Sequence, residues 1–215
     1  LAFPYVTDST GYTTQLILIN PPGTQNTSGV VHYIAADGTP LPIDTLRLGW
    51  VQVIPFAGSN TPHAHILLQH REAGVLTSIV GVEGELPGRT FRMYTASTGD
   101  FDSGINGSSR TGIALANPSE APAAAVLEVR SLNGTLIRTS QPIVVPPSGQ
   151  LSLLLNQVPG LETFAAPFEG VLRVVATSPQ GITATGFRAV HNERGNTLFT
   201  TTGPLNENAG TSEQI

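Results

Sequence analysis

The 215-residue chain is 40% hydrophobic and only 12% charged, with a formal net charge of -5 at pH 7. This composition indicates a folded chain and argues against nucleic-acid binding, because its ten basic residues are all arginines scattered singly along the sequence. The absence of cysteine excludes disulfides and thiolate metal sites, and the absence of lysine excludes a Walker-type phosphate lysine, a Schiff base and a Lys-Asn isopeptide bond.

Short runs of β-branched and apolar residues, separated by Gly, Pro and Asn, predict β-strands along the whole chain. Helical structure should be limited to a turn or two near Leu155 to Leu161, because no window shows the apolar spacing of a capped helix. In the first part of the chain the predicted strands cover residues 3–8, 12–20, 29–35, 39–43, 50–56, 63–70 and 75–83. In the second part they cover residues 89–97, 111–118, 124–132, 136–145, 150–158, 170–178, 182–190 and 197–203.

The two parts resemble each other in sequence. Asn20-Pro21 matches Asn117-Pro118, and GWVQV at 49–53 aligns with GVLRV at 170–174. A period of roughly 100 residues is too long for a solenoid, so each copy should be a domain with its own core. We therefore predict a first domain at residues 1–87, a second at 88–205 and a polar tail at 206–215.

The second copy carries a segment that the first lacks, VVPPSGQLSLLL at residues 144–155. The first domain should therefore lack one or two strands and leave sheet edges that something else must cover.

Comparison of the copies also separates core positions from surface positions, because residues two apart on a strand share a face. The residues predicted to point inward are Val31, Tyr33, Val51 and Val53, with Leu127, Val129, Leu172 and Val174 in the second copy. The outer face of the first domain is then unusually apolar, with Ile17, Ile19, Ile34 and Trp50. Such a face is covered by the second domain or a terminal strand of the same chain, contacts another subunit, or binds a ligand.

PPSGQL at 146–151, GVLRVVATSP at 170–179 and ITATGFRAV at 182–190 resemble uncharacterised tandem immunoglobulin-like modules of large secreted bacterial surface proteins. The resemblance implies a β-sandwich fold and an extracellular, non-catalytic setting, and it supplies no catalytic residues. We predict an all-β chain of two tandem Ig-like β-sandwiches related by an internal repeat. The first copy departs from the pattern because it lacks the PPSGQL segment.

His63 and His65 stand at i and i+2 with His70 and Glu72 beyond, and histidines at this spacing on a strand can reach one metal ion. The spacing does not match a cupin motif, so we interpret them as surface histidines. The loop from Asp100 to Ser108, with Asp100 and Asp102, offers oxygen ligands for calcium. It lacks a later bidentate Glu, and a polar loop is the preferred interpretation.

Trp50, with Tyr12 and Tyr94 elsewhere in the chain, has the amphipathic rings that stack on sugars. The preferred alternative is that Trp50 is packed under a loop or against the second domain. There is no G-x-S-x-G motif, and we expect no catalytic residue, metal or other cofactor.

These observations predict a non-catalytic extracellular structural protein, a subunit of a cell-surface or filamentous assembly held by β-strand pairing between neighbours. We expect a homo-oligomer or polymer formed through the outer face of the first domain, with residues 206–215 docked on a partner. Because the chain starts at Leu1 and has no apolar run near the ~20 residues that cross a bilayer, we expect export after removal of a signal peptide and no membrane span. The alternatives are a carbohydrate-binding or adhesin module of a secreted protein and a metal-dependent enzyme.

Overall fold

The computed structural model describes residues 1–8, 11–23, 27–42, 48–164 and 166–207. Within this part of the chain the regular elements are β-strands, apart from a single 3-10 turn, η2 (Leu155–Gln157). The chain is therefore all-β, as its period-2 patterns and its frequent Gly and Pro residues predict.

Two three-stranded antiparallel sheets form the first part of the fold. One has the order β1-β4-β3 and the other β2-β5-β6. Buried side chains from both sheets, including Phe3, Val51, Ile66 and Val82, meet in one core between them. We call this pair the first sandwich; its strands are β1 (Ala2–Thr7), β2 (Tyr12–Ile19), β3 (Gly29–Ala35), β4 (Leu48–Pro55), β5 (His63–Glu72) and β6 (Val75–Glu83).

A larger pair of sheets follows. The order β10-β9-β13-β7-β16, with β11 also paired to β9, makes a six-stranded sheet, and β12-β8-β14-β15 makes a four-stranded one. A second core, with Phe91, Leu115, Leu127 and Leu172, lies between them. We call this pair the second sandwich; its strands are β7 (Thr90–Ser97), β8 (Ser109–Ala116), β9 (Ala123–Arg130), β10 (Leu136–Thr139), β11 (Ile143–Val145), β12 (Gln150–Leu154), β13 (Phe168–Ala176), β14 (Thr183–His191), β15 (Thr197–Thr202) and β16 (Leu205–Asn206).

The predicted core positions are confirmed. Val51 and Val53 lie in the first core, with Val31 and Tyr33 packed against it. The corresponding residues of the second core are Leu127, Val129, Leu172 and Val174.

The structure differs from the strand predictions at four places. The predicted strand at 150–158 ends at Leu154, where the turn η2 follows. The predicted strand at 39–43 is reduced, over its described residues, to an isolated bridge between Ile34 and Pro40. The predicted strand at 136–145 divides into β10 and β11, which both pair with β9, because Pro142 interrupts it. The tail begins as strand β16 beside β7, which sequence patterning did not predict; residues 208–215 of the predicted docking tail lie outside the described residues.

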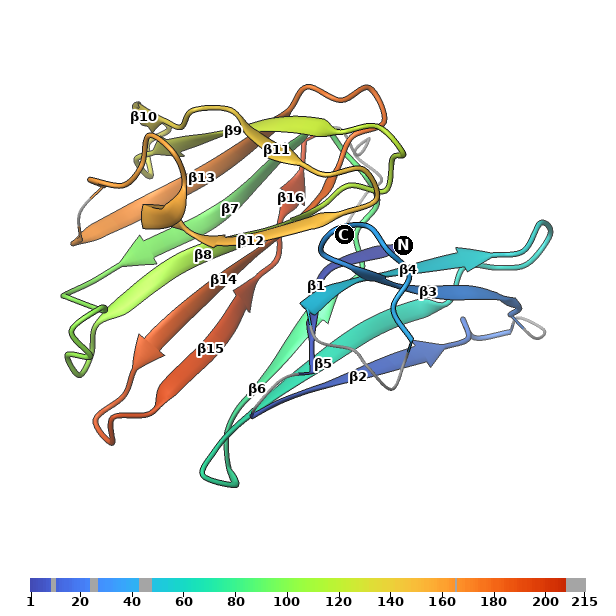
Figure 1. Ribbon diagram of the computed structural model, residues 1–215, viewed down its shortest axis with the longest axis horizontal. Coiled ribbons are helices and arrows are strands. Elements are labelled where there is room, and N and C mark those ends of the chain that lie inside the picture. Colours follow the sequence, from blue (N-terminus) through green and yellow to red (C-terminus); the bar gives the residue numbers. More distant parts are fainter. Residues whose placement is uncertain (9–10, 24–26, 43–47, 165, 208–215) are drawn as a thin grey trace.

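The two sandwiches lie side by side and diverge at the lower left of Figure 1, where β14 and β15 face β5 and β6. Edge strand β6 of the first sandwich runs next to edge strand β15 of the second. None of the described segments forms a helix with the length and hydropathy needed to cross a bilayer.

Candidate functional site

β2 is an edge strand whose start lies beside the end of β1: the Thr14 hydroxyl donates to the carbonyl oxygen of Thr7 at 2.6 Å and accepts from its amide at 3.1 Å. Over its whole length it pairs with β5, from Tyr12 opposite His70 to Ile19 opposite His63, without a register shift. Among the described residues no strand pairs with its other edge. Proteins usually protect such an edge with a charged residue, a proline or a bulge, and the sequence YTTQLILI contains neither charge nor proline. In the part of the chain that the structure describes, the outer edge of β2 from Gln15 to Ile19 is therefore unpaired by any strand.

The outer face of the sheet β2-β5-β6 carries exposed apolar side chains among polar ones. On this face Ile17 and Ile19 stand opposite His65 and His63. Ile19 is 52% exposed, and Ile79 on β6 is 56% exposed. A partner strand beside the end of β2 would lie next to Ile17 and Ile19.

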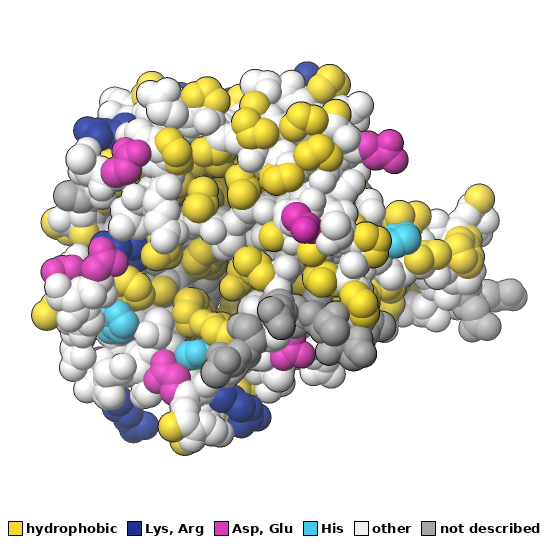
Figure 2. All heavy atoms as spheres, viewed as in Figure 1, with side chains coloured by type: hydrophobic (Ala, Val, Ile, Leu, Met, Phe, Trp, Pro, Cys, Tyr) yellow, Lys and Arg dark blue, Asp and Glu magenta, His cyan; other side chains and the backbone are white. Residues whose placement is uncertain are grey.

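A hollow opens at the end of the first sandwich where β2 finishes. Leu18, Val30, Val53 and Phe56 are among its lining residues, and Phe56 is 53% exposed. Figure 2 shows hydrophobic side chains gathered at this end of the molecule, at the right of the view. The hollow offers a place for an apolar side chain of a segment lying beside β2.

The predicted apolar outer face of the first domain is not a single surface. Ile17 and Ile19 belong to the sheet β2-β5-β6, whereas Ile34 and Trp50 pair with each other across β3 and β4 in the opposite sheet. The prediction failed here because it treated neighbouring segments of the chain as neighbours in one sheet, and the chain changes sheets between β2 and β3.

Trp50 is covered by the second sandwich. It is 0% exposed and packs with Ala2, Ala116 and the partly buried Ile34. Its Nε1 donates a hydrogen bond of 2.8 Å to the carbonyl oxygen of Ser148. The alternative that the second domain covers this residue is therefore correct, and Trp50 has no exposed ring for a sugar.

The edges of β6 and β15 cover each other through side chains. The Ser78 hydroxyl donates to the carbonyl oxygen of Phe199 and accepts from its amide, at 2.9 and 3.0 Å. Glu72 accepts from the Asn196 side chain at 2.6 Å and from the Thr197 amide at 3.0 Å. The hydrogen bond from the Asn196 side chain, with that from Thr197, holds the pKa of the Glu72 carboxyl below its usual value.

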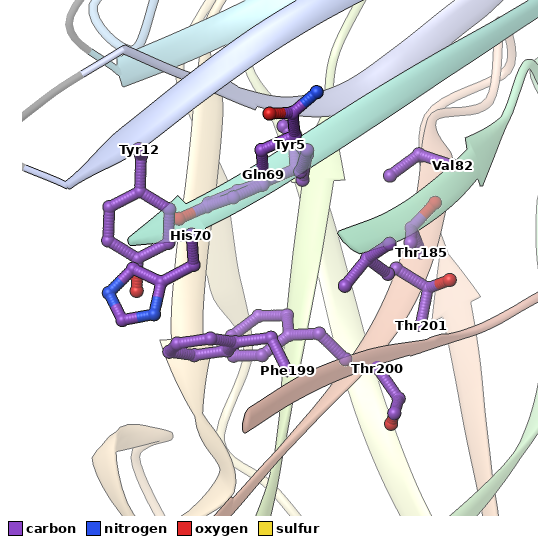
Figure 3. Close-up of a pocket in the computed structure, with 12 residues that line it drawn as sticks. Tyr5, Tyr12, Gln69, His70, Val82, Thr185, Phe199, Thr200 and Thr201 are labelled. Carbon is purple, nitrogen blue, oxygen red and sulfur yellow. The ribbon is translucent and has the colours of Figure 1, made fainter. Parts of the chain in front are cut away.

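A narrow aromatic cleft lies where the two sandwiches diverge. In Figure 3, Tyr12 and His70 lie at one end of it, Phe199 below, and Val82, Thr185 and Thr201 at the other end. The rings of Tyr12 and His70 are 4.3 Å apart between centroids, and both contact Phe199 edge-on. Burial raises the pKa values of Tyr5 and Tyr12, so both phenols stay protonated at neutral pH.

The candidate metal ligands are not brought together. His63 and His65 are exposed on the outer face of β5, whereas Glu72 is bound to the second sandwich. Asp102 forms an ion pair with Arg110, and Asp100 accepts hydrogen bonds from the amide and hydroxyl of Ser103. Among the residues that the structure describes, no group of three or more His, Asp or Glu side chains is placed to hold a metal ion.

The sequence pattern did not predict the cleft, although one residue that lines it, Phe187, is unusual in its strand. Phe187 occupies an outward position of β14, on the face that also carries Thr183 and Thr185, while Ala184 points into the core. A phenylalanine on the polar face of an alternating strand indicates a covered or binding surface. The residues that meet Phe187, such as Tyr5, come from strands far away in the sequence.

In comparisons with known proteins, the chain matches no family model, no curated protein and no solved structure.

Proposed function

We propose that the chain is a non-catalytic extracellular structural module made of two tandem Ig-like sandwiches related by an internal repeat, and that neighbouring copies join by β-strand pairing along β2. The extracellular setting rests on the resemblance of its motifs to secreted tandem modules. The pairing rests on the geometry of the β2 edge.

The strand orders support the repeat. The order β1-β4-β3 corresponds to β7-β13-β9 in the larger sheet, and β2-β5-β6 corresponds to β8-β14-β15. In this correspondence Leu16 and Leu18 of β2 stand where β8 has Ile113 and Leu115.

One observation carries the proposal of strand pairing: the place beside β2 that is unpaired in the first sandwich is filled in the second. There β12 pairs with β8, from Gln150 opposite Ala116 to Leu154 opposite Gly112. β12 comes from the 144–155 segment that the first copy lacks. An extended segment from a neighbouring copy takes the same position, beside Gln15 to Ile19, and its main-chain hydrogen bonds hold it there.

Substitution of Ile19 tests this mode of assembly. We expect Ile19→Lys to dissociate the higher-order particles of the native protein, because a charge at the end of an edge strand opposes the approach of another strand. Val144→Lys is the matched control, since Val144 is 58% exposed on β11, outside the first sandwich. Sedimentation velocity reads out the particle size.

The proposal fails if the native protein sediments as a 22.5 kDa monomer at every concentration. It also fails if Ile19→Lys and Val144→Lys change particle size to the same extent. Electron microscopy of the native protein then distinguishes filaments from closed oligomers.

A further inference from the structure

The aromatic cleft between the sandwiches continues into a second hollow. That hollow shares Phe187 and Phe199 with the cleft and extends to Ser152, Gln157 and His191. The two hollows form one groove along the outer face of β14 and β15. In Figure 2 a hollow lined with hydrophobic side chains is visible left of centre.

The fold holds Phe187 at the centre of this groove. A Cβ atom on Gly112 would lie 2.2 Å from Cζ of Phe187, so only glycine at this position lets the ring lie against the four-stranded sheet. On the first sandwich the ring of Tyr5 faces it, with 6.0 Å between centroids and an interplanar angle of 30°. Aromatic rings from both sandwiches therefore border the groove.

The polar groups of the groove are hydroxyls, amides and the imidazoles of His70 and His191. Its described lining contains no Asp, Glu, Lys or Arg, but it includes Thr200, Thr201, Ser152 and Gln157. Hydroxyl and amide groups both donate and accept hydrogen bonds, as the hydroxyls of a sugar require. A neutral sugar ring has an apolar face and a rim of hydroxyls. It fits aromatic rings flanked by hydroxyl and amide groups better than an anion, a cation or a purely aliphatic chain does.

We propose that the groove between the two sandwiches binds a neutral oligosaccharide, with sugar rings packed on Phe187 and its aromatic neighbours and sugar hydroxyls bonded to the Thr, Ser and Gln side chains. Tyr12 at the start of β2 lines the cleft, but the proposed strand pairing lies farther along β2, beside Gln15 to Ile19. Loss of assembly in Ile19→Lys therefore leaves the saccharide site intact, and the two proposals fail separately.

Isothermal titration with defined oligomers tests the site. The neutral probes are cellohexaose and mannohexaose; hexagalacturonate is a charged probe of equal length, and decaproline is a peptide that also prefers aromatic grooves. We expect saturable binding of a neutral hexasaccharide and at least about tenfold weaker binding in Phe187→Leu, which removes the ring but keeps an apolar side chain. Tyr94→Leu is the control, because Tyr94 lies on the far sheet, bonded to Glu169, and its loss should leave the affinity unchanged.

Amide chemical shifts provide a readout that does not depend on a variant. With the neutral hexasaccharide, the largest shifts should fall in β14, β15 and the start of β2. The proposal is overturned if neither neutral probe saturates, if hexagalacturonate or decaproline binds more tightly, if Phe187→Leu binds as the native protein does, or if the shifts lie outside the groove.

Discussion

The side chain of Trp50 contacts both sandwiches. Its ring is fully buried between them, and its Nε1 bonds to a carbonyl in the segment that leads into β12. The buried indole ring thus combines a large apolar contact area with an N–H group that has a hydrogen-bond acceptor. Trp50 therefore fixes one sandwich against the other.

Trp50→Ala should lower the free energy of unfolding by about 3–5 kcal/mol, as expected for removal of a large buried ring. Trp50→Phe keeps most of the apolar contact and loses the Nε1–Ser148 hydrogen bond, so it should cost only about 1–2 kcal/mol. Urea unfolding followed by circular dichroism measures both values. Equal losses in the two variants would contradict the packing described here.

Glu85 makes stability depend on pH. Burial, with a smaller effect of Glu83, raises the pKa of the Glu85 carboxyl from 4.5 to about 7. Its backbone is also paired with Ala2 of β1, which keeps the side chain near the contact between the sandwiches. The folded chain binds the Glu85 proton more tightly than the unfolded chain does. The bound proton therefore adds its full contribution to the free energy of unfolding below pH 4.5, and this contribution is lost as the pH rises through about 7.

Glu85→Gln should remove this dependence. Above neutral pH the variant should be more stable than the native chain by about 1–2 kcal/mol, after allowance for the solvent that reaches a partly buried carboxyl. Thermal unfolding between pH 4 and pH 8 tests the sign. A native chain that gains stability from Glu85 with rising pH would refute the assignment.

At the scale of strands, Gly112 of β8 leaves the space in which the Phe187 ring of β14 lies. A methyl group there meets Cζ of Phe187 at 2.2 Å and the Leu153 carbonyl at 2.9 Å, so Gly112→Ala should destabilise the chain by about 1–3 kcal/mol. Gly81→Ala is a matched strand control, because nothing lies within 4 Å of the added atom. Thermal unfolding of both variants checks the difference; equal melting temperatures would show that Phe187 does not lie over Gly112.

The strands were largely predictable from the sequence because a strand is a local pattern. Val51 and Val53 alternate with Trp50 and Gln52, and the structure has the same inward and outward sets. The sheet to which a strand belongs was not predictable in the same way. Ile17 and Trp50 were placed on one face, but which strands pair depends on contacts distant in the sequence that period-2 alternation does not record.

At the scale of the whole molecule, the candidate sites differ in how visible they are in the sequence. The unpaired edge of β2 was predictable because the first part of the sequence has no segment that corresponds to residues 144–155. The groove between the sandwiches brings together Tyr5, Tyr12, Phe187 and Phe199 from four separate strands. Apart from Phe187 on the outward face of β14, these residues fit the pattern of their own strands, so the packing of one sandwich on the other defines the groove.

Hydrogen exchange of β2 as a function of protein concentration tests the central claim most directly. In a separate molecule none of the described strands pairs with the outer edge of β2, while in the proposed assembly the amides at this edge bond to a neighbouring copy. Deuterium uptake over Gln15 to Ile19 should slow as concentration rises, while uptake over Ile143 to Val145 in β11 stays constant. Uptake over Gln15 to Ile19 that is the same at low and high concentration would contradict strand pairing at this edge.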